Sequence, residues 1–427
     1  MKKNTKISIC ILFILILCVM ITNSKKFTNI KTYTNSKICT KNKPMKIGNN
    51  NKVKNLKIHY IDIGNADSIL IEQSGHNMLI DTGTNDDSTL IVNYLKHQGV
   101  KKLDYVIGTY PHKNHIGGIG TIIKTFNVNQ VFIPKVTSTN ELFKNVVTTL
   151  KNKGLKATYP VVGNNYNLGN AKWTILAPNK AEYKSLNNYS IVTKLKFGNN
   201  SFIFTGDAKD ISERQILQKQ LDIHADVLKI GNHGNASSTT DAFLKKVNPI
   251  YAVISVGKEN SYGYPTYEVM ERLRKQNISV FRTDEQKNII VTSDGKNLTW
   301  NVSSWDNTKM NGYGSRSLKN GDKYIGYWKN GLFNGKGTLK YKNGDEYIGS
   351  FISGQKQGQG KYKWTNGEYY KGHWLKDKIE GTGTYIFKNG DNYEGHWSNN
   401  KMNGTGKYKF KNGKTLEGNW LNNNYIK

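Results

Sequence analysis

Four short segments of this 427-residue chain carry histidines or carboxylates that could do chemistry. They are Asp62-Ile63-Gly64-Asn65-Ala66-Asp67, Tyr110-Pro111-His112-Lys113-Asn114-His115, Thr205-Gly206-Asp207 and Gly231-Asn232-His233-Gly234. Imidazole nitrogens and carboxylate oxygens bind zinc and manganese in proteins, so these residue types could build a metal site. Two simpler interpretations stay open. The histidines could serve packing and hydrogen bonding, and Asp207 could be a turn residue after Gly206.

Alternating strands and helices must position these segments. From Leu56 onward short strand-like stretches alternate with helical ones, for example the helices expected at 89–97 and 141–151. Such alternation is typical of a layered α/β domain, in which polar groups at strand ends carry the chemistry. Each of the four segments lies at the end of a predicted strand, at 56–62, 103–108, 201–205 and 226–230.

The segments resemble the motifs of the metallo-β-lactamase superfamily. The likeness is to the exported nuclease-like domain of the competence protein ComEC, whose motifs read T-H-P-H-x-D-H-I-G-G, F-T-G-D, G-H-H-G-S and Y-G-H-P. Here the matching stretches begin at Thr109, Phe204, Gly231 and Tyr262, in the same order. The resemblance implies an αββα sandwich over residues 56–301 and a hydrolase that uses one or two zinc or manganese ions.

Several positions that bind metal in that family hold other residues here. Tyr110, Asn232 and Tyr264 stand at histidine positions, and Asn114 stands where an aspartate ligates metal and acts as general base. An amide carries no negative charge and cannot take up a proton as a carboxylate does. We therefore expect a degraded metal site, as in a pseudoenzyme. By this resemblance the remaining candidate ligands are His112, His115, Asp207 and His233, and Asp207 is also a candidate catalytic residue.

Residues outside these ligand positions have simpler expected roles. Asp62 and Asp67 are expected to brace the loop beneath the site. His59, His76 and His97 lie outside the motifs, so we expect them at the surface. The body of the chain has no cysteine, which excludes a disulfide framework and a cysteine-based zinc site there. The three cysteines are Cys10, Cys18 and Cys39.

The first 24 residues have the pattern of an export signal. Three lysines within the first six residues precede a nearly unbroken apolar run from Ile7 to Ile21. This run is shorter than the ~20 residues of a typical membrane-spanning helix, and it fits a signal peptide or a short signal anchor. Residues 25–55 read as a basic, flexible tether. We expect an exported protein, secreted or held at the extracellular face of the membrane through this segment.

Residues 305–427 form a repeat array. A step of 23 residues relates Tyr324, Tyr347, Tyr370 and Tyr393, and each of these is followed by a glycine two positions later. Asn-Gly pairs, which favour tight hairpins, recur at the same step, so each unit reads as two short strands. The pattern resembles the MORN repeat family. The resemblance implies an open all-β array with stacked core aromatics, and it makes self-association through the repeats possible.

Charge is strongly positive along the whole chain, with 62 Lys+Arg, 31 Asp+Glu and a formal net charge of +31. Residues 1–55 contain 12 basic and no acidic residues, residues 56–300 contain 29 basic and 21 acidic ones, and residues 301–427 contain 21 basic and 10 acidic ones. A basic surface favours an anionic polymer such as nucleic acid, a cell-wall polymer or lipid headgroups. A compositional bias toward Lys, Asn and Ile would give the same totals, and this alternative stays open.

Three functions are consistent with these features. The first is an exported, surface-associated protein with a degraded metal site that binds an anionic partner through its basic surface and its repeats. The second is an active metal-dependent phosphodiesterase or nuclease that uses a reduced site. The third is a cell-envelope scaffold that acts through the repeats alone.

Overall fold

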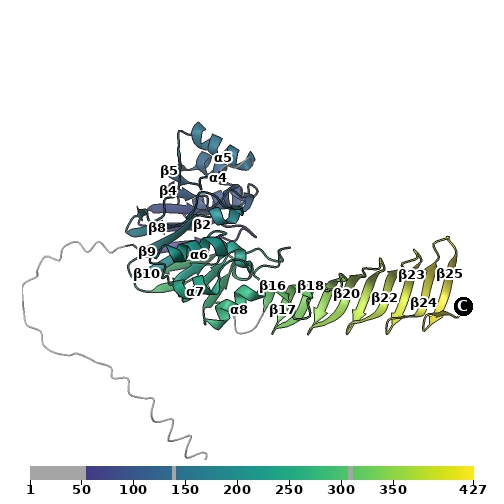
Figure 1. The fold of residues 1–427 in the computed structure, drawn as a ribbon. Coiled ribbons are helices and arrows are strands. Elements are labelled where there is room, and N and C mark those ends of the chain that lie inside the picture. The colour runs from purple at the N-terminus through teal and green to yellow at the C-terminus, as the bar shows by residue number, and fades with distance from the viewer. Residues whose placement is uncertain (1–53, 137–140, 306–310) are drawn as a thin grey trace, which may run out of the picture. The chain divides into compact units, whose positions relative to one another are not determined.

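The computed structural model describes residues 54–136, 141–305 and 311–427, and their strands form three sheets (Figure 1). The export signal and nearly all of the tether predicted from the sequence lie outside the described residues and stay predictions. Within the described ranges no helix is both long and apolar enough to cross a bilayer.

The first sheet has eight strands and contains both termini of the α/β domain. Its β3, β4, β5 and β6 run parallel, whereas its other neighbouring strands are antiparallel. In spatial order the strands are β15 (Leu298–Trp300), β14 (Ile289–Ser293), β1 (Leu56–Tyr60), β2 (Ile69–Gln73), β3 (His76–Ile80), β4 (Lys102–Ile107), β5 (Asn127–Phe132) and β6 (Ala157–Thr158).

The second sheet has seven strands. Its β10, β11, β12 and β13 run parallel, and its β10, β9, β8 and β7 are antiparallel. In spatial order the strands are β13 (Ser279–Arg282), β12 (Tyr251–Ile254), β11 (Val227–Lys229), β10 (Asn200–Phe204), β9 (Val192–Phe197), β8 (Ala171–Ala177) and β7 (Asn165–Leu168).

Three apolar layers make this domain an αββα sandwich, as the resemblance implied. Side chains from both sheets, such as Ile58 and Phe202, pack between the sheets. Helices α2, α4 and α5 pack on the outer face of the first sheet, and α6, α7 and α8 pack on that of the second. The helices are α2 (Ser88–His97), α3 (Lys113–Ile116), α4 (Ile119–Thr125), α5 (Glu141–Asn152), α6 (Asp210–Gln218), α7 (Asp241–Val247), α8 (Tyr267–Lys275) and α9 (Thr283–Gln286), with single 3-10 turns η2 (Leu186–Tyr189) and η3 (Gly231–Gly234).

The surface position predicted for His59 is wrong. Its side chain is buried because β1 alternates, so that Ile58 and Tyr60 face the second sheet while His59 faces helix α2. There Nδ1 lies 2.9 Å from the hydroxyl of Tyr94, and Nε2 lies 2.9 Å from a carboxylate oxygen of Glu72. A buried histidine with two polar partners has a structural role.

The third sheet contains the repeats, and all its neighbouring strands are antiparallel. Two strands come from each 23-residue unit, as the repeat pattern predicted. The strands are β16 (Gly312–Ser317), β17 (Lys323–Lys329), β18 (Leu332–Lys340), β19 (Glu346–Ile352), β20 (Gln355–Lys363), β21 (Tyr369–Leu375), β22 (Lys378–Ile386), β23 (Asn392–Ser398), β24 (Lys401–Lys409), β25 (Thr415–Leu421) and β26 (Asn424–Tyr425).

One glycine from each strand of β16 to β25 lies directly opposite a glycine of the next strand. This glycine column is Gly314, Gly326, Gly337, Gly349, Gly360, Gly372, Gly383, Gly395, Gly406 and Gly418. On one face a buried tyrosine lies over the two column glycines of each of four units, from Tyr324 over Gly326 and Gly337 to Tyr393 over Gly395 and Gly406. A β-carbon added at Gly406, for example, would lie 2.1 Å from the hydroxyl oxygen of Tyr393. These positions are therefore glycines because the tyrosine rings occupy the space that a side chain would need.

The aromatic side chains of this face form the core of the array. Trp328, Trp374 and Trp397 are buried, which confirms the stacking role predicted for them. Each repeat tyrosine contacts the tryptophan or phenylalanine of its own unit edge to face, as in Tyr393 and Trp397 with ring centroids 5.2 Å apart and an interplanar angle of 87°. It also contacts the equivalent ring of the next unit, as in Tyr393 and Trp420 with centroids 5.3 Å apart. Edge-to-face packing is favourable for aromatic pairs, and here it links one unit to the next.

Candidate metal centre

His115 lies in α3, at the carboxyl end of β4, and its side chain is fully buried. Its Nδ1 lies 2.7 Å from Oδ2 of Asp81, which follows the neighbouring parallel strand β3. The Nδ1 proton is therefore donated to the carboxylate, and the lone pair of Nε2 is left facing Oδ1 of Asp207 at 3.4 Å. A carboxylate that orients a histidine in this way is a common support for a metal ligand.

His233 enters the same space from η3, directly after β11. Asn232 and His233 both have left-handed backbone conformations, with φ of 49° and 54°. The amide N–H of Asn232 donates to the carbonyl oxygen of Gly206 at 3.0 Å, which fixes this turn to the loop that carries Asp207. Nδ1 of His233 donates to the carbonyl oxygen of Ser255 at 2.9 Å, so Nε2 carries the lone pair and lies 3.6 Å from Oδ1 of Asp207.

Three ligand atoms thus converge: one from each of His115, Asp207 and His233, all within 4.8 Å of one another. Nε2 of His115 and Oδ1 of Asp207 are buried and have no hydrogen-bond partner. Buried acceptors without a donor are costly, and a cation between them would remove that cost. Two imidazoles and a carboxylate are also a donor set that suits zinc or manganese, so these residues fit one ion.

The electrostatics of the cluster agree with a cation site. Burial alone would raise the pKa of Asp207, but the facing imidazoles of His115 and His233 outweigh burial and hold it below its usual range. Burial alone would lower the pKa of His115, but Asp81 and Asp207 outweigh it and raise that pKa well above the ordinary value. The carboxylates thus favour a positive charge here, which a proton or a metal ion can supply.

The second oxygen of Asp207 is already engaged. The hydroxyl of Tyr110 donates to Oδ2 at 2.6 Å, and the side-chain amide of Asn187 donates to the same oxygen at 3.2 Å. Burial and the charge of Asp207 raise the pKa of Tyr110 above its ordinary value, so the phenol stays neutral and acts as a donor. Tyr110 and Asn187 therefore both occupy Oδ2, while Oδ1 faces the two imidazoles.

The other predicted site residues lie around this cluster. Asn114 does not face an open ligand position, because its Nδ2 lies 3.1 Å from Nε2 of His233. His112 is exposed and outside the converging group, with its Nδ1 against Oδ1 of Asn114 and its ring stacked on Tyr110. Tyr264 is half-buried, and its hydroxyl accepts a hydrogen bond from the amide of Asn235. Of the four predicted ligands, the structure brings three together.

Support for the site comes from residues around the ligands. Asp67, expected to brace the loop, is buried and pairs with Lys229, whose Nζ lies 2.9 Å from its Oδ2. Asp81 is not among the residues predicted from the sequence, although it follows the apolar stretch Met78-Leu79-Ile80, as the other site segments follow apolar strands. Nothing in the sequence marks Asn187, which reaches Asp207 from the turn η2 between β8 and β9.

Two family models match the chain. The model of the metallo-beta-lactamase superfamily matches residues 61–258, and the MORN repeat model matches five consecutive units between 302 and 415. The first of these units, 302–323, covers the region of Trp305 and Asn311 that opens the array.

Proteins similar to this chain include ComE operon protein 3 of Bacillus subtilis, 30% identical over 252 residues, which cover 55% of this chain and 32% of that protein. Recombination protein 2 of Haemophilus influenzae is 29% identical over 53% of this chain and 27% of its own length. Competence protein ComA of Neisseria gonorrhoeae is 27% identical over 52% of this chain and 30% of its own length. The chain thus spans about a third of the length of these curated relatives.

Among solved structures, the metallo-beta-lactamase fold protein YhfI of Bacillus subtilis aligns with a TM-score of 0.40 and 12% identity, over 56% of this chain and all of that one. The diiron β-hydroxylase CmlA of Streptomyces venezuelae aligns with a TM-score of 0.36 and 12% identity, over 54% of this chain and 53% of that one. The chain thus carries a metallo-β-lactamase domain, matched over residues 61–258, followed by MORN repeats.

Proposed function

We propose that this is an exported, competence-related protein that holds DNA through its basic surfaces and has kept a single-ion version of the superfamily's metal site. DNA is the anionic polymer we favour because the relatives are named competence and recombination proteins. Export is supported by the lysines and apolar run of residues 1–24. The excess of Lys and Arg over acidic residues favours a polyanion along the whole chain.

One observation carries the single-ion proposal: the two oxygens of Asp207 have different surroundings. Oδ2 accepts hydrogen bonds from Tyr110 and Asn187, whereas Oδ1 has no hydrogen-bond partner and faces the two imidazoles. A second ion at Asp207 would have to displace the phenol and the amide from Oδ2 or share Oδ1 with the first ion, and it would need further ligands of its own. Tyr110 and Asn114 stand at two of the positions where the family places such ligands, so we infer a single ion.

When bound, zinc or manganese would supply a positive charge that polarises a phosphoryl oxygen and acidifies a bound water. His115, Asp207 and His233 would hold it, and Asp81 and the carbonyl of Ser255 keep both imidazoles in the required tautomer. Asn114 replaces the family's general base with an amide that cannot accept a proton. This combination favours binding of a phosphodiester over its rapid hydrolysis.

Metal content tests the single-ion site. After incubation with zinc or manganese and removal of free metal, the full chain should retain about one ion, measured by inductively coupled plasma mass spectrometry. His115→Ala should retain none, because it removes one of three ligands. Tyr110→His with Asn114→Asp should approach two ions, since it returns ligand types to the second position. Two ions in the wild type, or none, would contradict the proposal.

The second candidate function is a working single-ion phosphodiesterase. The convergence of three ligand atoms favours it, and those of His115 and Asp207 have no hydrogen-bond partner. It predicts hydrolysis of DNA or bis(p-nitrophenyl) phosphate that depends on added manganese and disappears in His115→Ala. The matched control is His112→Ala, which removes an exposed imidazole outside the cluster and should leave the rate unchanged. We expect the wild-type rate to rise by at least an order of magnitude in the Tyr110→His/Asn114→Asp variant.

A scaffold that acts through the repeats alone is the third possibility. It shares the MORN array with the first proposal but needs neither metal nor DNA. Unchanged localisation of a His115→Ala/His233→Ala variant that has lost its metal, together with no DNA binding by the wild type, would favour it.

A further inference from the structure

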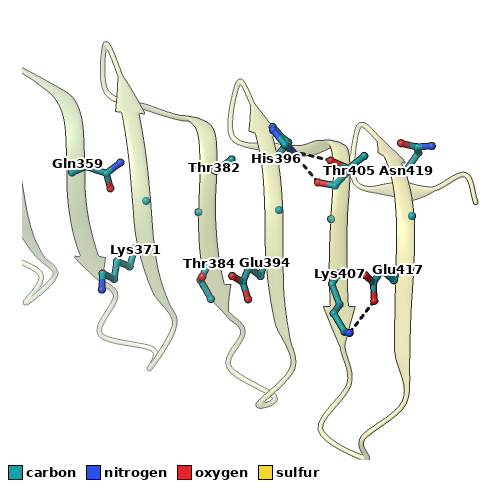
Figure 2. A pocket seen from close by; sticks show the side chains of 15 residues that line it. Gln359, Lys371, Thr382, Thr384, Glu394, His396, Thr405, Lys407, Glu417 and Asn419 are labelled. Carbon is teal, nitrogen blue, oxygen red and sulfur yellow. Dashed lines mark hydrogen bonds and ion pairs between the residues drawn. The ribbon is translucent and has the colours of Figure 1, made fainter.

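The MORN sheet has a second face, opposite the aromatic core. Residues before and after each glycine of the column point to this face, because side chains alternate along a strand. Figure 2 shows two rows of these side chains with the glycine positions between them. One row includes Lys371, Glu394 and Lys407, and the other includes Thr382 and Thr405. Between the rows lies a hollow of about 770 Å³ with a floor of glycine backbone.

Lysine dominates the charge of this face. Counting the residues one position from each column glycine, and those three positions away on the side of the Lys371 row, this face carries eight lysines and three glutamates. We call this surface the lysine face; its charged residues are Lys323, Lys336, Lys340, Lys361, Lys363, Lys371, Lys407, Lys409, Glu346, Glu394 and Glu417.

Few of these lysines are neutralised by the protein itself. Lys340 pairs with Glu346 at 3.4 Å and Lys407 pairs with Glu417 at 2.8 Å. The other six form no ion pair within the described residues, and all six are exposed. Lys361 lies over the ring of Tyr369, with its Nζ 5.2 Å from the ring centroid, but no carboxylate neutralises these six ammonium groups within the described residues. Their charge is therefore available to an external anion.

The dimensions of the face suit a long polymer. The unpaired lysines extend from β17 to β24, seven strand steps, or roughly 34 Å at ~4.8 Å per step. That length matches about ten base pairs of duplex DNA at ~3.4 Å per pair. A hollow with glycine backbone at its base fits a rod-shaped duplex better than a flat bilayer. Lysine is also a point charge, which contacts phosphates without reading bases.

We propose that the lysine face binds duplex DNA along the axis of the MORN array, through phosphate contacts that do not depend on sequence. This inference rests on the proposed function only in taking DNA as the anionic polymer. It assigns the contact to one face of the repeats and leaves the metal centre uninvolved.

The salt dependence of binding tests the assignment. Anisotropy of a labelled 20-base-pair duplex, titrated with the full chain at several salt concentrations, gives the slope of log K against log salt. Each phosphate neutralised adds about 0.9 to that slope. Lys361→Gln/Lys363→Gln/Lys371→Gln should therefore lower its magnitude by about 2.7 and weaken binding to duplexes of any sequence alike.

A matched control has the same loss of charge elsewhere on the array. Lys342, Lys388 and Lys411 are exposed in turns between strands, outside the rows of the lysine face. Their triple change to Gln should leave the slope within about 0.5 of the wild-type value. Equal losses in the two triple variants would mean a general charge effect and would overturn the proposal.

The remaining outcomes separate this inference from the proposed function. Duplex binding that the Lys361/Lys363/Lys371 variant leaves intact would place DNA elsewhere on the chain and overturn the inference alone. No binding of the duplex by the wild type would overturn the DNA-binding part of the proposed function as well. Binding of phosphatidylserine vesicles that depends on these three lysines, with no duplex binding, would assign the face to a membrane surface instead.

Discussion

Lys229→Met is expected to destabilise the α/β domain by about 3–5 kcal/mol, the usual cost of breaking a buried ion pair by removing one partner. Lys229 is fully buried on β11, and its Nζ lies 2.9 Å from Oδ2 of Asp67 and 3.0 Å from the carbonyl oxygen of Ile230. Methionine would fill most of the space but leave the buried Asp67 carboxylate without a counter-charge. Denaturant unfolding, followed by a probe in this domain, measures the loss.

A double-variant cycle identifies the cause. Asp67→Asn/Lys229→Met removes both charges, so it should recover a large part of the stability lost in Lys229→Met. Lys287→Met is the control, because Lys287 pairs with Asp62 at 3.4 Å while 76% of its side chain is exposed. That exposed pair should contribute less than about 1 kcal/mol. A double variant no more stable than Lys229→Met would show that lost packing, not the unpaired charge, is responsible.

Gly406→Ala is expected to destabilise the repeat array by about 1–3 kcal/mol, the typical cost of overpacking. The added methyl would lie 2.1 Å from the hydroxyl oxygen of Tyr393, whose ring is fully buried and contacts both Trp397 and Trp420. The ring cannot move without opening these contacts between neighbouring units. Hydrogen exchange of the β23 and β24 amides should therefore accelerate, while the α/β domain should exchange as before.

Gly413→Asn is the control for this change. Gly413 lies in a turn with φ of +85°, and a β-carbon there would meet nothing within 4 Å. Asparagine tolerates the left-handed region better than other residues with side chains, so exchange should change little. If both variants accelerate exchange to the same extent, a general sensitivity to losing glycine would explain the result, and the contact with Tyr393 would not.

Most of the architecture could be predicted because it depends on periodic patterns. The 23-residue step defined the repeats, and the strand-end segments carried the resemblance that implied the sandwich. His59 shows the limit of such patterns. His59 stands between the apolar residues Ile58 and Tyr60 on β1, a pattern that predicts an exposed side chain. Both faces of this sheet are covered, however, so the side chain that faces α2 is buried as well. Whether a sheet is covered on one face or two is decided by distant parts of the chain.

The site could be predicted only in part, for a related reason. His115, Asp207 and His233 follow strand ends of the family pattern, and parallel neighbours bring such ends together. The role of Tyr110 could not be predicted from the sequence, where a tyrosine at a histidine position of the family indicates only the loss of a metal ligand. In space its hydroxyl donates to Asp207 and so changes what the remaining residues can hold. Asn187 joins the same oxygen across a sequence separation of 20 residues, with no motif to mark it.

The unbroken glycine column makes the array a linear chain of units, each in contact only with its neighbours. Its stability is then a sum of unit and interface terms, and no single cooperative transition needs to govern it. The last strand, β26, spans only Asn424–Tyr425, so the far end has the fewest contacts to lose. Units at that end can open and close while the rest stays folded, and a single melting temperature would not describe the whole molecule.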